Sequence, residues 1–557
     1  MTIDNSPFTI HPMSRIDWII LVVTLCGIII YGIYKSRTSK NLDGYFLSNR
    51  SMPWYLVLLS IMGTQASAIT FLSAPGQAYT DGMRFVQYYF GLPLAMIIIC
   101  IVFVPIFRNL KVYTAYEYLE TRFDSKTRTF TSFLFQLSRG LSTGVSIYAP
   151  SLILSSLLGW NIYWTNILMG GLLIIYTVSG GAKAVAYTQQ LQLLIIIIGM
   201  VTAGYMVVHL MPEGVGFTEA LNIGGRNGKM NVITDGVGKS GFDWKDKYNI
   251  WSGLIGGFFL ALSYFGTDQS QVGRYLTAKD NRESRLGLLI NGLVKVPMQF
   301  LILLVGVLVF SFYHYNKAPV YFNDTQIAAA KETTRKDSLI SLETQYQQIL
   351  PGNDAEAFAV RNRYKEVLKR ALPGEEINDT NYIFLKFVID YLPKGLVGLL
   401  IAMIFLAAWG SIAAALNALA SCTVVDIHKK FINKELTPEM DYNLSRVYTL
   451  CWGIFSIAVA EFASNLGNSL IETVNILGSL FYGVILGIFL VAFWFKKIRG
   501  NATFYSAIVS ELLVILIYKM DVISFLWLNV IGALLVIIIA TALQVLLKDR
   551  QNYKTVE

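Results

Sequence analysis

Charged residues are scarce in this 557-residue chain: they make up 15% of it, whereas hydrophobic residues make up 54%. A soluble chain of this length would normally divide into several domains with charged surfaces. Instead, apolar runs of about 20 residues, the length that crosses a bilayer, recur along nearly the whole sequence. The sequence therefore predicts an all-α polytopic membrane protein embedded in a lipid bilayer.

Cysteine and histidine are also rare, with four of each. The cysteines lie in apolar segments without CxxC spacing, and the histidines are scattered, so neither disulfides nor a zinc site is indicated. The sequence has no GxxxxGK[ST] phosphate-binding loop and no nucleophile–base constellation. We therefore expect no enzymatic activity, no cofactor and no use of ATP.

The net charge of +9 does not indicate nucleic-acid binding, because lysines and arginines gather in short loops between apolar runs. Such loops face the cytoplasm. Their alternation predicts a multi-pass protein of the cell (inner) membrane, with the N-terminus outside and a short cytoplasmic tail at 548–557. The polar first seventeen residues do not form a signal peptide.

We predict one transmembrane domain over residues 1–557, with roughly thirteen spans. They lie near 17–34, 52–78, 84–107, 128–158, up to 178, 185–210, 249–272, 285–313, 394–425, 447–464, 469–495, 502–518 and 523–547. The longest polar segment, 315–385, contains helix-like charged stretches such as Glu356–Lys369. We expect it to be an extracytoplasmic insert, either solvated and dispensable or a lid or partner surface.

The second predicted span is unusually polar between Ser60 and Thr70, and Pro75-Gly76 follows it. In a bilayer every backbone group needs a partner. A polar, weakly helical stretch at that depth indicates a broken helix that lines a cavity and offers carbonyl oxygens to a cation. A helix contact built on small residues is the alternative.

Two basic residues lie inside predicted spans, where ionisable side chains are costly and often functional. Arg139 suits a carboxylate or a similar anion. Alternatively, it pairs with a buried acid, for which the candidates are Glu461, Glu472 and Glu511. Lys295 lies about a turn into its span, so its side chain either faces a solute or extends to the membrane surface.

The ninth predicted span carries a face of small residues that includes Ala407, Gly410 and Ser411. Residues at this spacing are neighbours on a helix. The face permits close helix packing. Its carbonyls and the Ser411 hydroxyl are also suitable oxygen ligands for a small cation.

Taken together, these segments resemble the sodium:solute symporter family. The resemblance rests on Tyr176 to Thr188 (YTVSGGAKAVAYT), with support from Tyr264 to Leu276 and from Ser411 through Asn417 to Asp426. It covers about residues 15–520 and leaves the 315–385 insert unexplained. It implies a LeuT-type fold of two inverted five-helix repeats and sodium-coupled symport of a small organic solute by alternating access.

The resemblance also implies a sodium site formed by the carbonyls of Gly63 and Ala66 together with Ala407, Gly410 and Ser411. The chain departs from the family at Gly410, where a hydroxyl residue is usual. Members that bind an additional sodium often have Asp where this chain has Gln189, which argues for a single sodium.

The implied solute contacts come from several branches of the family. Ser67, Thr70 and Arg139 match the sialic acid branch. Lys295, Tyr264 and Phe265 match the glucose branch, while Gln65 and Tyr89 occupy cavity-facing positions.

We expect the solute to be an organic anion such as a sialic acid or a monocarboxylate. A sugar symporter, a proton-coupled or sodium-independent carrier, and a transporter-fold membrane sensor are the alternatives. The short C-terminal tail argues against the sensor.

Overall fold

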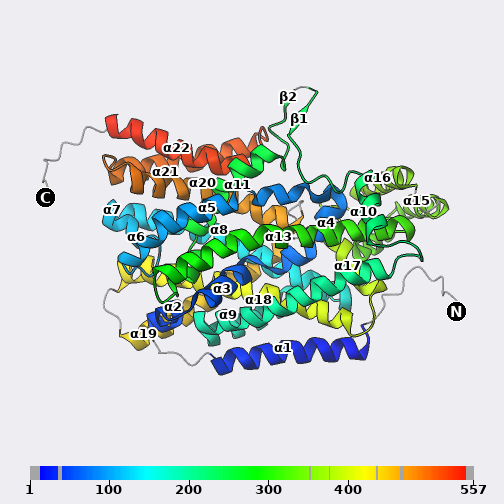
Figure 1. Ribbon diagram of the computed structural model, residues 1–557, viewed down its shortest axis with the longest axis horizontal. Coiled ribbons are helices and arrows are strands. Elements are labelled where there is room, and N and C mark those ends of the chain that lie inside the picture. The colour runs from blue at the N-terminus through cyan, green and yellow to red at the C-terminus, as the bar shows by residue number, and fades with distance from the viewer. Residues whose placement is uncertain are drawn as a thin grey trace, which may run out of the picture.

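The computed structural model is built almost entirely of helices (Figure 1). It describes residues 13–35, 41–239, 241–349, 353–375, 377–433, 437–463 and 469–546. The predicted tail at 548–557 lies outside the described residues.

The first half of the chain supplies α1 (Arg15–Lys35), α2 (Leu42–Leu47), α3 (Trp54–Gln65), α4 (Ala68–Asp81), α5 (Leu92–Ile98), α6 (Val104–Asn109), α7 (Glu117–Arg122), α8 (Ser125–Leu158), α9 (Ile162–His209), α10 (Phe217–Arg226), α11 (Gly257–Gly266) and α12 (Gln269–Leu276). A small antiparallel hairpin pairs β1 (Val237–Gly238) with β2 (Gly241–Phe242). The second half supplies α13 (Asn281–Tyr315), α14 (Asp324–Lys331), α15 (Lys336–Gln348), α16 (Asp354–Ala371), α17 (Thr380–Tyr391), α18 (Leu396–Cys422), α19 (Pro438–Phe462), α20 (Leu470–Trp494), α21 (Gly500–Lys519) and α22 (Phe525–Leu546).

Nine helical stretches of the described chain are long and apolar enough to cross a membrane, and three shorter apolar helices accompany them. A protein that crosses a membrane repeatedly is therefore supported, whereas the total of about thirteen spans stays a prediction. The predicted fifth and sixth spans both fall within α9, whose apolar stretches are Ile162–Ile175 and Ala182–His209.

Two helices are interrupted near the middle of the bundle. Helix α3 ends at Gln65 and α4 begins at Ala68, with Ser67 in an extended conformation between them. This is the interruption that the polar stretch predicts. A second break, which the sequence analysis did not find, separates α11 from α12, where Asp268 caps α12 by accepting a hydrogen bond from the Ser270 amide at 2.8 Å.

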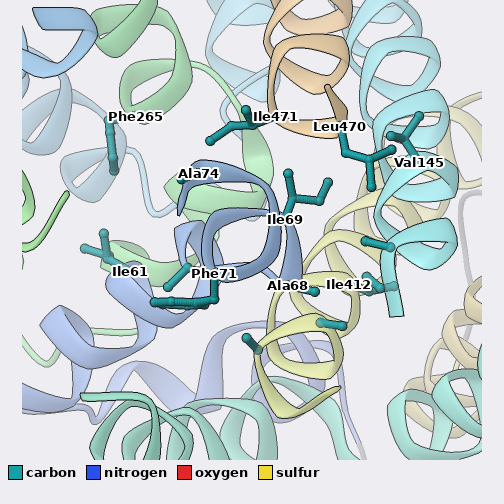
Figure 2. Packing of buried hydrophobic residues seen from close by; sticks show 14 of the residues in the cluster. Ile61, Ala68, Ile69, Phe71, Ala74, Val145, Phe265, Ile412, Leu470 and Ile471 are labelled. Carbon is teal, nitrogen blue, oxygen red and sulfur yellow. The ribbon is translucent and has the colours of Figure 1, made fainter. Parts of the chain in front are cut away.

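Helices from both halves of the chain enclose the first break. Figure 2 shows apolar side chains of α3 and α4 among those of the neighbouring helices α8, α11, α18 and α20. Close packing is built into α13, because a Cβ at Gly306 would lie 2.1 Å from the Pro75 carbonyl oxygen of α4. Small residues at such contacts are typical of helix packing in membranes.

The 315–385 insert is a folded unit rather than an irregular loop. Helices α14, α15 and α16 surround a separate apolar cluster that includes Leu339, Tyr364 and Leu368. Its charged stretch forms α16, as predicted. In Figure 1, α15 and α16 lie at the same end of the bundle as α10 and the hairpin, opposite α6 and α7.

Candidate functional site

A cavity lies beside the first helix break. It contains about 840 Å³ of empty space, counting the solvent at its mouth. All eight residues predicted to contact solute line it: Gln65, Ser67, Thr70, Tyr89, Arg139, Tyr264, Phe265 and Lys295. They come from α3, α4, α8, α11 and α13, from the turn between α3 and α4, and from the segment after α4. Tertiary folding thus gathers residues that are up to 230 positions apart in the sequence.

Arg139 forms an ion pair with Asp268, the residue that caps α12. Asp268 is 1% exposed. The Tyr482 hydroxyl donates to the same carboxylate at 2.8 Å, and the Arg139 guanidinium lies 5.3 Å from the centre of the Tyr264 ring. A buried arginine and carboxylate held in this way compensate each other's charge.

None of the acids proposed as partners of Arg139 takes that role. Glu472 pairs with Lys247 at 3.1 Å, and Glu461 accepts a hydrogen bond from Asn166 at 3.2 Å. Glu511 has no described hydrogen-bond partner. The expectation was therefore wrong in its choice of acid. Asp268 could have been found from the sequence, because it is an acid inside an apolar span.

Lys295 does not extend to the membrane surface, since it is 1% exposed and lines the cavity. Its ammonium nitrogen lies 5.4 Å from the centre of the Tyr89 ring, a distance suited to a cation–π contact. No ion pair links it to a described carboxylate. With Arg139 paired to Asp268, Lys295 is the basic side chain of the cavity that has no described carboxylate partner.

Polar side chains that the sequence analysis missed complete the wall. Asn475 lines the cavity and accepts a hydrogen bond from the Tyr88 hydroxyl at 3.1 Å. It lies on α20 three residues after Glu472, which does not line the cavity. Asn291 of α13 accepts a hydrogen bond from the Gln65 amide at 2.9 Å.

The predicted sodium ligands lie on the other side of the same break, where α3 faces α9 and α18. Gly63 and Ala66 end α3, and no described residue donates a hydrogen bond to either carbonyl. Across from them, the Ser411 hydroxyl donates to the carbonyls of Ala407 at 3.1 Å and Ala408 at 3.0 Å. Free carbonyls at a helix break are suitable ligands for a small cation.

Gln189 fills the space between these helices with a neutral amide. Its nitrogen donates to the Gly410 carbonyl at 3.0 Å and to the Thr64 hydroxyl at 3.2 Å. Its oxygen accepts from the Ser60 hydroxyl at 2.8 Å. The side chain is fully buried and ties α9 to both α3 and α18.

This packing explains why residue 410 is glycine. A Cβ at Gly410 would lie 2.5 Å from the Gln192 side-chain oxygen and 3.2 Å from Cγ of Gln189. A hydroxyl-bearing side chain at this position would therefore require the end of the Gln192 side chain to move. Of the five predicted sodium ligands, Gly410 has its carbonyl already engaged by an amide.

Known proteins resemble this chain over most of its length. The family model described as "Sodium:solute symporter family" matches residues 45–345 and 355–510. The sodium/sialic acid symporter NanT of Aliivibrio fischeri is 26% identical over 97% of this chain and 95% of its own length. SiaT of Proteus mirabilis is 26% identical over 96% of this chain and 95% of its own.

A more distant relative and a solved structure are also similar to most of this chain. Sodium-coupled monocarboxylate transporter 1 of Xenopus laevis is 25% identical over 89% of this chain and 70% of its own length. A solved structure of a sodium-coupled sialic acid symporter in a substrate-bound outward-open state superimposes with a TM-score of 0.77 at 25% identity. It covers 96% of this chain and 98% of that chain.

Proposed function

This chain belongs to the sodium:solute symporter family, and from that premise we propose that it couples sodium entry to the uptake of a small organic anion. The family model matches most of the chain, including both interrupted helices. The fold is of the LeuT type, in which transport proceeds by alternating access around a central site.

We base the choice of an anionic solute on the basic side chains of the cavity. Arg139 is compensated by Asp268, whereas Lys295 is buried without a described carboxylate partner. A buried charge without a partner is unfavourable. An anionic solute supplies that partner, and a neutral sugar does not. The two bacterial relatives named above are sialic acid symporters, which agrees with an acid that also carries hydroxyl groups.

We assign a role to each group according to its position in the cavity. Lys295 holds the solute carboxylate, while Arg139 contributes its free Nε and positions the Tyr264 ring. The aromatic pair Tyr264 and Phe265, with ring centres 4.9 Å apart, covers the apolar face of the solute. Gln65, Ser67 and Thr70 contribute hydrogen bonds to its hydroxyls.

Sodium binds between the broken helix and α18 in this proposal. The carbonyls of Gly63, Ala66 and Ala407 and the Ser411 hydroxyl are its ligands. A single sodium holds α3 and α18 together and stabilises the outward-facing solute site. Such a shift requires that sodium bind one state more tightly than the other. We place the protein in the cell membrane, with its N-terminus outside and its C-terminus in the cytoplasm.

A sodium-independent carrier is the second candidate, and one observation favours it. The Gln189 amide already bridges the helices that sodium would bridge. In that case the amide would hold the two helices without a cation, and sodium would not affect solute binding.

Thermal unfolding of the purified protein separates the two. We expect N-acetylneuraminate or lactate to raise the melting temperature more strongly with sodium than with potassium. Their neutral counterparts, N-acetylmannosamine and glycerol, serve as matched controls. If an acid raises the melting temperature equally in sodium and in potassium, the sodium-independent carrier is favoured. Stabilisation by the neutral sugar alone overturns the anion assignment.

A further inference from the structure

A second cavity lies where the insert meets the bundle. We call it the insert pocket, and it is lined in part by Tyr79, Lys229, Tyr313, Lys317 and Arg361. It contains about 930 Å³ of empty space, again counting the solvent at its mouth. Tyr79 belongs to α4, Tyr313 to α13 and Arg361 to α16, so the insert and the bundle each form part of the wall.

Two of its four cationic side chains already have a carboxylate partner. Arg361 and Lys365 share the buried carboxylate of Asp379, at 3.5 Å and 2.6 Å. The other lining carboxylate, Asp354, contacts His314 at 2.8 Å. Both lining acids therefore already have a partner side chain.

The other two cations, Lys229 and Lys317, have no ion pair with a described carboxylate. Lys229 donates to the Thr80 carbonyl, and Lys317 donates to the carbonyls of Gln347 at 2.5 Å and Ile349 at 2.9 Å. Burial lowers the pKa of Lys229, although Asp81 and Asp354 partly oppose that effect. An anion in the pocket would stabilise both ammonium groups.

One buried hydroxyl in the wall also lacks a partner. Tyr313 is 6% exposed, and its hydroxyl has no hydrogen bond to any described residue. Buried polar groups are usually hydrogen-bonded, so an unpaired hydroxyl in a cavity wall is available to bond a ligand. Tyr79, Phe310 and Tyr346 supply aromatic surface around it.

The two bundle helices of this wall continue to the solute cavity. Along α4, Tyr79 lies nine residues beyond Thr70, a distance of roughly 14 Å. Along α13, Phe310 lies fifteen residues beyond Lys295, or roughly 22 Å. Arg361 of the insert donates to the Tyr79 hydroxyl at 3.2 Å and so contacts the far end of the broken helix.

We propose that the insert pocket is a second solute-binding site, which takes a small hydroxylated organic carboxylate before it reaches the central cavity. Lys229 and Lys317 hold the carboxylate, and the Tyr313 hydroxyl hydrogen-bonds to a hydroxyl of the ligand. The insert is then part of the uptake route and is not dispensable.

Equilibrium dialysis on the full-length protein in lipid nanodiscs tests this, with radiolabelled N-acetylneuraminate, gluconate and lactate as probes. We expect at least one of these acids to bind at two equivalents per chain. The double variant Lys229→Gln/Lys317→Gln should lose one equivalent, and Lys295→Gln should lose the other. Tyr313→Phe should weaken the first site severalfold. The exposed Lys369→Gln of the same insert is the matched control and should keep both.

The outcomes separate the two sites. One equivalent that is lost in Lys295→Gln and retained in the double variant overturns the insert pocket and leaves the central site intact. One equivalent that is lost in the double variant and retained in Lys295→Gln supports the insert pocket and contradicts an anion site in the central cavity. If none of the acids binds to the wild-type protein, the insert pocket proposal is wrong. Melting curves of each variant verify that it is folded.

Discussion

The solute cavity and the sodium region lie on two sides of one helix break, yet they are built differently. The cavity collects charged groups, namely Arg139, Asp268 and Lys295, around open space. The sodium region has no charged side chain among its predicted ligands, and the neutral Gln189 fills much of it. In our proposal, the charged groups of the cavity select the solute, whereas uncharged oxygens bind the cation.

The largest expected effect comes from breaking the ion pair in the cavity. Arg139→Ala leaves Asp268 buried without its cation, which should cost about 3–5 kcal/mol of stability. Thermal or denaturant unfolding in detergent measures it. The double variant Arg139→Gln/Asp268→Asn should recover much of the loss, because no charge then remains unpaired. An Arg139→Ala protein as stable as the wild type would mean that the pair is not formed.

Lys295→Gln should act in the opposite manner, since it removes a charge that has no partner. Stability should be unchanged or higher. Uptake of the organic anion should fall about 10- to 100-fold, corresponding to the loss of a charged hydrogen bond of about 1.5–3 kcal/mol. Initial rates in proteoliposomes measure this, with the exposed Lys497→Gln as control. A large loss of stability together with full transport would contradict the role assigned to Lys295.

In the sodium region, Gly410→Ser tests the close packing by the two glutamines. The new Cβ would lie 2.5 Å from the Gln192 oxygen, so we expect a loss of about 1–3 kcal/mol in stability. The double variant Gly410→Ser/Gln192→Ala also removes the Gln192 amide. It should therefore regain the lost stability and expose the new hydroxyl at position 410 to sodium. The sodium concentration for half-maximal uptake should then decrease. If Gly410→Ser alone unfolds at the wild-type temperature, residue 410 is not confined as described.

The smallest effect concerns the membrane potential. Symport of one sodium with a monovalent anion moves no net charge, so the ~2.3 kcal/mol per 100 mV acting on a single charge has no influence. A tenfold sodium gradient then supplies about 1.4 kcal/mol. Valinomycin-imposed potentials should leave the uptake rate unchanged. A strong acceleration by an inside-negative potential would require a second cation or a neutral solute.

Local sequence patterns predicted most helices and the first helix break. Apolar runs located most helices, and the polar stretch at Ser60–Thr70 correctly predicted the first break. The second break was missed because Thr267 and Asp268 follow an ordinary apolar run, and Asp268 caps the helix that begins after it. A cap is recognised from the sequence only when the break itself is expected.

Side-chain partners depend on tertiary contacts, and there the sequence was a weaker guide. The partner of Arg139 comes from a residue 129 positions away, and three other acids were equally suitable from position alone. Lys295 was expected about a turn into its span, but it lies fourteen residues, or roughly 21 Å, from the start of α13. Its side chain therefore stays inside the bundle and faces Tyr89. The insert pocket joins five separate segments, none of which carries a motif of its own.

The most direct test is accumulation of labelled N-acetylneuraminate and lactate in proteoliposomes, with sodium either present outside or replaced by potassium. Our account predicts accumulation of at least one of the two acids that requires the inward sodium gradient and is largely lost in Lys295→Gln but not in Lys497→Gln. Equal accumulation without sodium, or accumulation that Lys295→Gln leaves intact, would contradict sodium-driven symport of an organic anion.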